Sequence, residues 1–251
     1  MELGLRGRRA VVAASSAGLG FESARALAAD GARVAISGRD ADRLTAAADR
    51  LRAEGADVVA VPADVSTPEG AEAMVAAAAE ALGGVDVLVA NAGGPPPGTF
   101  ATTTIDAYRA ALDLNLLSTV AMCRAAVPGM QAAGWGRVVA ITSIGARQPI
   151  ATLMASSTAR AGLTGFLKVL ATEVAPDGVT VNSVQPGVHR TDRLASLSSD
   201  ALAGLEADIP AGELGDPADF GAVVAFLCSD QARFLTGAAI PVDGGASRAL
   251  L

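Results

Sequence analysis

The sequence predicts a single α/β domain, built on a doubly wound Rossmann-type parallel sheet with helices on both faces. Short apolar runs rich in Val alternate along the chain with longer segments of helical periodicity. The length of 251 residues and the hydrophobic content of 51% suit one sizeable core. A glycine turn separates the first run from the first helix, as in nucleotide-binding sheets. Residues 1–251 show no domain boundary and no repeat beyond this alternation.

The expected elements follow from apolar spacing and from the glycines and prolines that end each run. The predicted strands cover residues 8–14, 33–37, 58–61, 85–90, 137–142, 179–185 and 238–242. The predicted helices cover residues 19–29, 41–52, 69–82, 105–133, 152–175 and 218–228. Residues 188–216 are polar and interrupted by Pro and Gly, so we expect a mobile substrate flap with short helices.

The glycine turn is the first candidate for a binding site. Gly18 and Gly20 follow the first apolar run, and a helix with an apolar face begins at Leu19. The free N–H groups and the positive dipole end of such a helix would bind a pyrophosphate. Ser15 and Ser16 could add hydroxyl donors. A plain strand–helix turn that binds nothing is the alternative, because a lone glycine pattern is weakly specific.

Charge and composition limit the partners. The formal charge of −7 and the pI of about 4.7 argue against nucleic acid and anionic membranes. The sequence has no run of 18 uninterrupted apolar residues, so it predicts no transmembrane helix. The N-terminus lacks the apolar core of a secretory signal, so no such signal is expected. We therefore expect a cytoplasmic protein that acts on a small molecule.

Residue counts restrict the chemistry further. Cys123 and Cys228 lie in apolar helical contexts and are expected to be buried thiols in a reducing compartment. With two cysteines and one histidine, we expect no metal site. The chain has one Tyr, one Lys and one His, which are Tyr108, Lys168 and His189. A mechanism that needs any of these side chains therefore has a single candidate.

Several further motifs occur in an order and at a spacing that resemble the short-chain dehydrogenase/reductase family. The resemblance covers nearly the whole chain. The motifs are Ala13–Gly20, Asp64-Val65, Asn91-Ala92-Gly93, Asn115, Ser143, Pro186-Gly187 with Thr191, and Thr236-Gly237 with Asp243-Gly244-Gly245. The last pair is similar to the tail of 3-oxoacyl-(acyl-carrier-protein) reductases.

The resemblance implies roles for these residues. Asn115 and Ser143 match members of the family's catalytic set, and Asp64 matches the residue that contacts the adenine. Thr191 matches the residue that meets the nicotinamide carboxamide. The expected cofactor contacts are Ala14, Ser15, Ser16, Gly18, Leu19, Gly20, Arg39, Asp64, Val65, Asn91, Ala92, Gly93, Arg160, Pro186, Gly187, Val188 and Thr191.

Two departures from the family pattern stand out. Ala13-Ala14 replaces Thr-Gly, so the leading glycine of the turn is absent. The family's Tyr-x-x-x-Lys motif is also missing, because its positions hold Ser156 and Arg160. Their i, i+4 spacing still places both on one helix face. Tyr108 lies on a different predicted helix and cannot substitute.

The second departure changes the expected chemistry. In the family, the Tyr hydroxyl exchanges a proton with the substrate oxygen, and the Lys lowers the Tyr pKa. The hydroxyl of Ser156 is a far weaker acid, and Arg160 keeps a positive charge but cannot release a proton. Together with Ser143, they form a polar, cationic catalytic pocket without an evident acid. Loss of a general acid typically costs ~10²–10⁴ in rate.

Three other residues are weaker candidates for the substrate pocket. His189 lies near the expected site and could act as an acid–base group near neutral pH. Arg147 and Gln148 follow the catalytic Ser143 position and could line the pocket. For each of the three, a solvated loop residue without a role is the alternative.

The end of the second predicted strand indicates the cofactor. An NAD enzyme usually carries an acidic residue at the position of Gly38, where it binds the ribose 2′-hydroxyl. Gly38 removes that carboxylate, and Arg39 could bind a 2′-phosphate. Asp40 is expected to cap the following helix. We therefore expect NADP(H) to be favoured over NAD(H).

These observations predict an NADP(H)-binding oxidoreductase that acts on a carbonyl or alcohol through an atypical catalytic centre. A cyclase or dehydratase on the same scaffold, or a cofactor-sensing pseudo-enzyme, is the alternative. Residues 105–133 and 152–175 carry Ala, Leu and Val on more than one face, as subunit-contacting helices do. In the family these helices form a subunit interface, so we expect a homotetramer or homodimer.

Overall fold

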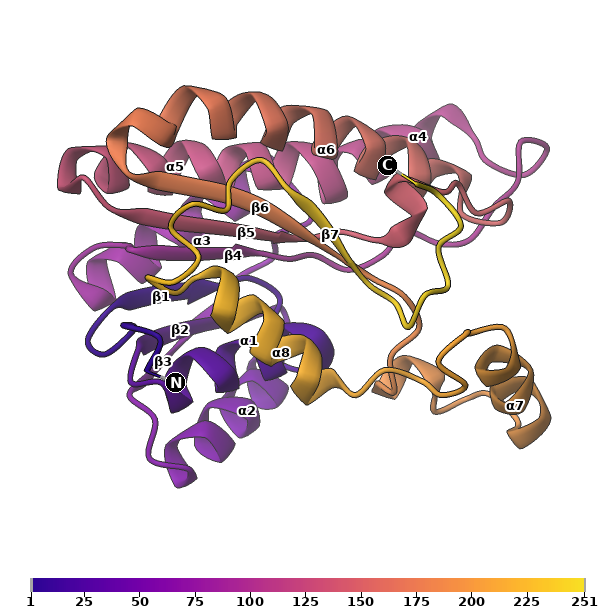
Figure 1. Cartoon of the computed structure of the whole chain (residues 1–251), viewed down its shortest axis with the longest axis horizontal. Helices are drawn as coiled ribbons and strands as arrows, with labels where there is room; N and C mark the ends of the chain where they lie inside the picture. Colours follow the sequence, from indigo (N-terminus) through magenta and orange to yellow (C-terminus); the bar gives the residue numbers. More distant parts are fainter. Residues whose placement is uncertain (1, 251) are drawn as a thin grey trace.

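The computed structural model describes residues 2–250 and has one parallel seven-stranded sheet (Figure 1). The strands are β1 (Arg9–Val12), β2 (Arg33–Gly38), β3 (Val58–Pro62), β4 (Val87–Ala90), β5 (Gly136–Ile141), β6 (Val179–Pro186) and β7 (Ala239–Val242). Their order is β3-β2-β1-β4-β5-β6-β7, so the direction of winding reverses between β1 and β4. Doubly wound sheets bind ligands in the crevice at the carboxyl ends of the two strands between which the winding reverses, here β1 and β4. Residues 1 and 251, the ends of the predicted domain, lie outside the described residues.

Helices cover both faces of the sheet, which confirms the predicted fold class (Figure 1). One face carries α1 (Gly18–Ala29), α2 (Ala41–Ala53) and α8 (Pro217–Leu227). The other face carries α3 (Pro68–Leu82), α5 (Ser118–Ala133) and α6 (Met154–Val174). The central strands are buried on both sides, and this explains why they read as continuous apolar runs.

The predicted elements are confirmed with one difference inside the segment 105–133. The structure divides this segment into α4 (Ile105–Leu112), a π-helical turn (Asp113–Leu117) and α5. A π turn holds one more residue per turn than an α-helix and is often found at functional sites. Asn115 lies in the middle of this turn. The apolar period of the sequence does not reveal such a local change of helix type.

The predicted flap leaves the sheet after β6 and contains two short helices. They are a 3₁₀ turn (Asp192–Leu194) and α7 (Ser199–Ala207), and no residue of α7 is fully buried. In Figure 1 this region extends away from the layered body of the protein. Its position beyond the carboxyl end of β6 places it beside the crevice at the switch point.

One helical segment among the described residues, 105–133, is long and apolar enough to cross a membrane by length and composition alone. Half of its most apolar window is buried inside the protein. On α5, Met122, Val127 and Met130 are buried in the core beneath the sheet. Packing against the sheet therefore accounts for the apolar character of this segment.

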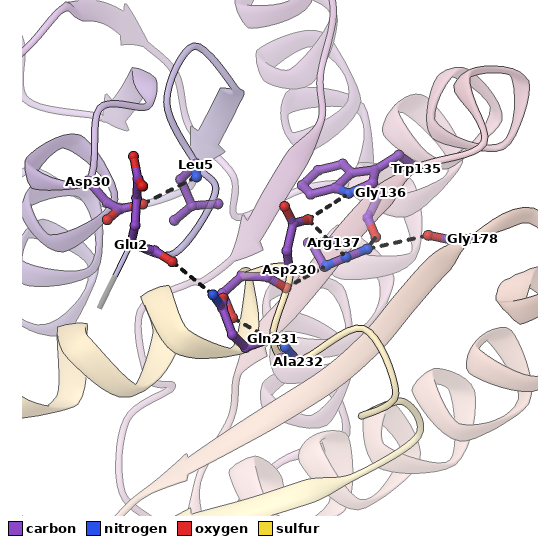
Figure 2. Close-up of polar contacts among 11 residues, drawn as sticks. Glu2, Leu5, Asp30, Trp135, Gly136, Arg137, Gly178, Asp230, Gln231 and Ala232 are labelled. Atoms are coloured by element: carbon purple, nitrogen blue, oxygen red, sulfur yellow. Dashed lines mark hydrogen bonds and ion pairs between the residues drawn. The ribbon is translucent and has the colours of Figure 1, made fainter.

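A network of contacts around Arg137 lies at the amino ends of the strands, opposite the crevice. This arginine, at the start of β5, is buried and stacks over the ring of Trp135 at 4.3 Å. Its Nη1 atom donates to the carbonyl oxygens of Gly136 and Gly178, at 2.8 and 3.3 Å. Figure 2 shows Asp230 between the guanidinium and the indole, whose Nε1 atom donates to it at 3.3 Å. This network anchors β5 at its amino end.

Candidate functional site

The chain leaves β1 through a backbone conformation that normally requires glycine. Ala14 has a φ of 46° and is the one non-glycine residue among residues 2–250 with a positive φ. A left-handed conformation costs an L-residue roughly 1–2 kcal/mol. The side-chain amide of Asn91 donates to the carbonyl oxygen of Ala14 at 3.1 Å and holds the turn. The absent family glycine therefore falls on the position where the backbone most needs one.

The two remaining positions of the turn require glycine, each for a different physical reason. Gly18 has a φ of 59°, which is also left-handed. At Gly20 a Cβ atom would lie 2.6 Å from the carbonyl oxygen of Ala14 and 2.8 Å from the amide nitrogen of Asn91. The residue that precedes α1, Ala17, makes no side-chain cap bond. The first N–H groups of α1 therefore remain for a ligand, as the sequence predicts.

The two serines of the turn have different surroundings. Ser15 is fully buried, and its Oγ atom donates to the carbonyl oxygen of Val12 and accepts from the backbone N–H of Ser37. Its backbone N–H also bonds to Ser37, at 2.7 Å. These contacts make Ser15 a brace between β1 and β2, with its hydroxyl hydrogen used inside the protein. Ser16 instead lines the cleft described next.

A cleft of about 570 Å³ runs from the end of β2, past the β1 turn, to the start of α6. Predicted cofactor contacts line it, namely Ala14, Ser16, Arg39, Asp64, Val65 and Gly93. The opposite wall is formed by the loop after β4, with three consecutive prolines, and by α4. The cleft reaches α6 at Ala155, next to Ser156. Such a shape and size suit a dinucleotide better than a small ion.

Arg39 and Asp64 lie at the β2–β3 end of the cleft. The Nε atom of Arg39 is 4.0 Å from a carboxylate oxygen of Asp64, and both side chains are largely exposed. A Cβ atom at Gly38 would lie 3.1 Å from the side chain of Ser16, so little room exists for a larger residue. Asp40 caps α2 by accepting from the N–H of Arg43, as predicted.

The loop after β4 is tied to the π turn. The Nδ2 atom of Asn115 donates to the carbonyl oxygen of Gly93 at 2.8 Å. The Oδ1 atom of this buried side chain has no hydrogen-bond partner in the described residues. Ala92 packs against the core, whereas a Cβ atom at Gly93 would meet open space. An unpartnered buried acceptor beside an open cleft indicates a place for a ligand donor or an ordered water.

Ser143 follows β5, where the resemblance expects the catalytic serine. Its Oγ atom accepts from the N–H of Gly145 at 3.0 Å. A Cβ atom at Gly145 would lie 3.3 Å from Ser143 Oγ and 3.4 Å from Ser157 Oγ. The hydroxyl of Ser157 accepts from the N–H of Ile150, at 3.4 Å. The start of α6 therefore faces the residues that follow β5, as the catalytic arrangement requires.

Ser156 and Arg160 are joined on α6. The Nε atom of Arg160 donates to the Oγ atom of Ser156 at 3.3 Å, and its Nη1 atom donates to the carbonyl oxygen of Ile141 at 3.2 Å. Both side chains are buried. Burial, together with the positive charge of Arg193, lowers the pKa of Arg160 to about 10. The guanidinium still carries its charge at neutral pH.

The start of the flap lies over the glycine turn. Gly187 donates its N–H to the carbonyl oxygen of Val242, and Val188 accepts from the N–H of Gly215. Thr191 lies so close to the turn that a Cβ atom at Gly18 would be 3.7 Å from its methyl group. The segment after Pro186 therefore borders the expected pyrophosphate position, and Leu19 packs in the core beneath it.

The surroundings of His189 differ from those of an acid–base group in the substrate pocket. The ring is buried and meets the ring of Phe220 edge-on at 5.2 Å between centroids. Its Nδ1 atom is 3.3 Å from the carbonyl oxygen of Gly187. Burial lowers the pKa of His189, although Gly187 and Asp216 act in the opposite direction. These contacts join the flap base to α8, and His189 does not line the cleft.

Arg147 and Gln148 also make contacts within the protein. The Nη2 atom of Arg147 donates to the carbonyl oxygen of Ala239 at 2.9 Å, which turns the side chain toward β7. The Oε1 atom of Gln148 accepts from the N–H of Arg248 at 2.6 Å. Neither residue lines the large cleft. Both connect the loop after β5 to the C-terminal part of the chain.

The residues present suit a nicotinamide dinucleotide. The uncapped start of α1 supplies N–H donors, and Gly20 permits the close packing that presents them. Arg39 supplies charge at one end of the cleft, and the unpartnered Asn115 oxygen marks the other. Among residues 2–250 there is no group of three His, Cys, Asp or Glu side chains placed to hold a metal.

Comparison with known proteins agrees with this geometry. The family model described as enoyl-(acyl carrier protein) reductase matches residues 13–247. The human protein named dehydrogenase/reductase SDR family member 4 is 34% identical over 244 residues, which is 96% of this chain and 88% of the relative. The chain belongs to the short-chain dehydrogenase/reductase family. It is an NAD(P)-dependent oxidoreductase of the short-chain type.

Two further similarities cover almost the entire chain. The 3-oxoacyl-(acyl-carrier-protein) reductase of Vibrio cholerae is 34% identical over 97% of this chain and 98% of its own length. The L-sorbose reductase of Gluconobacter frateurii, solved with NADPH and L-sorbose, superposes with a TM-score of 0.93 at 32% identity, covering all of both chains. The fold is therefore shown from both sequence and structure.

Sequence reasoning overlooked two residues at the site. Arg193 lies on the flap, and a Cβ atom at Gly94 would be 2.6 Å from its Nη2 atom. Gln185, near the end of β6, is buried with both side-chain polar atoms unpartnered in the described residues. The sequence offered no clear signal for Gln185, because β6 also carries Thr180, Asn182 and Ser183. The position of Arg193 depends on how the flap folds back, which no local pattern reveals.

Proposed function

We propose that the protein is an NADP(H)-dependent reductase of a small carbonyl compound. The single observation that carries the choice of NADP(H) is Arg39 on the cleft wall, beside a glycine at the usual acidic position. The exposed guanidinium can form charge-assisted hydrogen bonds to a 2′-phosphate. The similar L-sorbose reductase, solved with NADPH, supports this choice.

Different residues along the cleft contact different parts of the cofactor. The first turn of α1 binds the pyrophosphate, Asp64 and Val65 border the adenine, and Thr191 borders the nicotinamide. Arg160, held by Ile141 and Ser156, presents a positive charge to the nicotinamide ribose. When bound, the reduced nicotinamide supplies the hydride. The protein supplies position, charge and a dry surface on both sides of the dinucleotide.

Ser143 and Ser156 orient the substrate oxygen. The Oγ atom of Ser156 accepts from Arg160, so its own hydrogen is available to donate toward a carbonyl oxygen. The guanidinium polarises this hydroxyl, which is still a far weaker acid than a phenol. Ser156 therefore stabilises developing negative charge, and water supplies the proton that completes the alcohol. This arrangement predicts slow reduction of ordinary ketones.

We also propose the assembly and location that the sequence suggests. Ile105, Leu117 and Val169 are exposed apolar side chains on α4, the π turn and α6. Their exposure supports a homodimer or homotetramer formed through these helices. We propose that residues 188–216 cover the substrate within one domain, and that the protein works in the cytoplasm.

The test measures NADPH and substrate together. Purified protein is supplied with NADPH and a panel of ketones and aldehydes, and both NADPH absorbance and carbonyl loss are followed. Equal consumption of the two supports the proposal. Substrate loss without NADPH oxidation favours a cyclase or dehydratase. Tight NADPH binding with no loss of any carbonyl favours a cofactor-sensing protein.

A further inference from the structure

Arg193 is a positive charge that the flap brings to the cleft. It lies in the 3₁₀ turn Asp192–Leu194, and its guanidinium reaches the loop after β4 beside Gly94. Gly94 lines the cleft. The preceding Thr191 lies instead at Gly18, on the glycine turn. The start of the flap therefore meets the rim of the cleft at two places, with Arg193 beside the loop after β4 and Thr191 beside the glycine turn.

A second positive charge, Arg160, lies on α6. Hydrogen bonds to Ser156 and to the carbonyl oxygen of Ile141 hold its guanidinium. The positive charge of Arg193 adds to the effect of burial in lowering the pKa of Arg160. Within residues 2–250, neither arginine forms an ion pair with a carboxylate.

Two acidic residues of the flap, Asp192 and Glu206, pair with other arginines. Arg190 is 3.4 Å from Glu206, and Asp192 is 3.3 Å from Arg43. Two like charges that share a cleft repel each other, and the repulsion is relieved when an anion binds between them. A guanidinium presents a planar set of donors that suits a carboxylate or phosphate.

We propose that Arg193 binds a carboxylate carried by the carbonyl substrate, with Arg160 adding positive charge nearby, so that the substrate is an oxo acid. This rests on the proposed reductase function. The hydride of NADPH and a proton from water add across the C=O bond, which gives a hydroxy acid and NADP⁺. The carboxylate is unchanged and serves to position the carbonyl against Ser143 and Ser156. A phosphate of the cofactor has the same chemistry, but the pyrophosphate is expected at the uncapped first turn of α1, beside Gly18, whereas the guanidinium of Arg193 lies beside Gly94.

The kinetic test compares acids with their neutral counterparts. A series of 2-, 3- and 4-oxo acids is assayed beside the corresponding methyl esters, with wild type, Arg193→Gln and Arg190→Gln. We expect wild type to prefer at least one acid over its ester. Arg193→Gln should raise the KM for that acid by ~10-fold or more, as expected for loss of a charge-assisted bidentate contact. The KM for the ester should change less than about threefold.

Arg190→Gln is the matched control. It removes one positive charge from the same flap, but from an arginine already paired with Glu206. It should leave the acid-to-ester preference within about twofold, because a paired surface charge contributes little. Arg193→Lys should retain part of the preference. Since Arg193 is exposed, all of these variants are expected to keep the melting temperature of wild type.

A binding measurement separates this inference from the reductase function. Each oxo acid of the series is titrated into the protein bound to NADP⁺, where no reduction can occur. Binding that weakens ~10-fold in Arg193→Gln supports the carboxylate site even if no turnover is ever seen. Equal use of acids and esters by wild type would overturn the inference. So would an Arg193→Gln variant whose affinity for NADPH falls as much as its affinity for the acid, because the anion would then be a cofactor phosphate.

Discussion

The Nε atom of Arg160 donates to the Oγ atom of Ser156 at 3.3 Å, one helical turn earlier on α6. The family resemblance assigns this pair to the positions where the family pattern has Tyr and Lys. The contact joins the two side chains at i, i+4 spacing on one helix face. What is lost is a group whose pKa approaches neutrality.

Restoring Tyr and Lys at these two positions should restore a general acid to the site. We expect the double variant Ser156→Tyr, Arg160→Lys to raise NADPH oxidation with a generic ketone by ~10²-fold or more, because an ammonium can lower the pKa of a neighbouring phenol. Ser156→Tyr alone should gain less, since Arg160 cannot complete proton transfer. Steady-state kinetics on the three proteins provides the measurement.

Two results would contradict this expectation. The first is a wild type that reduces simple ketones as fast as the double variant, which would identify water or another group as an efficient donor. Alternatively, a folded double variant that binds NADPH could gain no activity. The cleft would then serve different chemistry, and a cyclase or dehydratase would become the better explanation.

The strained Ala14 offers a test of backbone conformation. Ala14→Gly removes a left-handed cost of roughly 1–2 kcal/mol, of which the greater freedom of glycine in the unfolded chain offsets roughly 0.5–1 kcal/mol. We therefore expect a modest rise in the free energy of unfolding, measured by urea denaturation. Ala13→Gly is the control, because Ala13 is fully buried and has no positive φ. It should destabilise the protein, and equal effects of the two changes would refute the strain.

Arg39 should determine cofactor preference. We expect tighter binding of NADPH than of NADH in calorimetry, and Arg39→Ala should remove most of the difference while leaving NADH affinity nearly unchanged. Arg50→Ala is the control, since this arginine of α2 stacks over Phe21 at 4.4 Å and does not line the cleft. If the two cofactors bind equally and Arg39→Ala alters neither affinity, the 2′-phosphate site is elsewhere or absent.

His189 should affect stability in acid rather than catalysis. Its pKa in the folded protein lies below the usual value of 6.5, mainly because the ring is buried. Between these two pKa values the unfolded chain binds more protons, so the free energy of unfolding falls as the pH drops below about 6.5. His189→Gln should show a smaller loss across this window, measured by denaturation at several pH values. If this variant lost its activity at neutral pH with unchanged stability, His189 on the flap would be the general acid.

The exposed apolar side chains on α4 to α6 predict self-association. Light scattering at micromolar protein should give a mass of at least twice 24.8 kDa. Val169→Glu should shift this toward the monomer, because the charge would be buried in the interface. Ala46→Glu, at an exposed position of α2 on the other side of the sheet, should not. A monomeric wild type would reject the proposed interface.

Much of the fold was predictable because its determinants are local. The apolar runs and the glycines and prolines that end them located the strands and most helices within a few residues. The departures at Ala14, Ser156 and Arg160 were visible because each depends only on identity and spacing. Arg39 was likewise found from its position after the second strand, and the cleft includes it.

The sequence by itself therefore determined the layer architecture and the glycine turn, both of which follow from short-range pattern. Only the tertiary structure decided what each side chain touches. It turned Ser15 inward as a brace, buried His189 against Phe220, and brought Arg193 across to Gly94. These contacts join residues distant in the chain, and they form because the sheet and the flap pack as one body. No local periodicity encodes that packing, so the charge balance of the catalytic cleft becomes visible only in three dimensions.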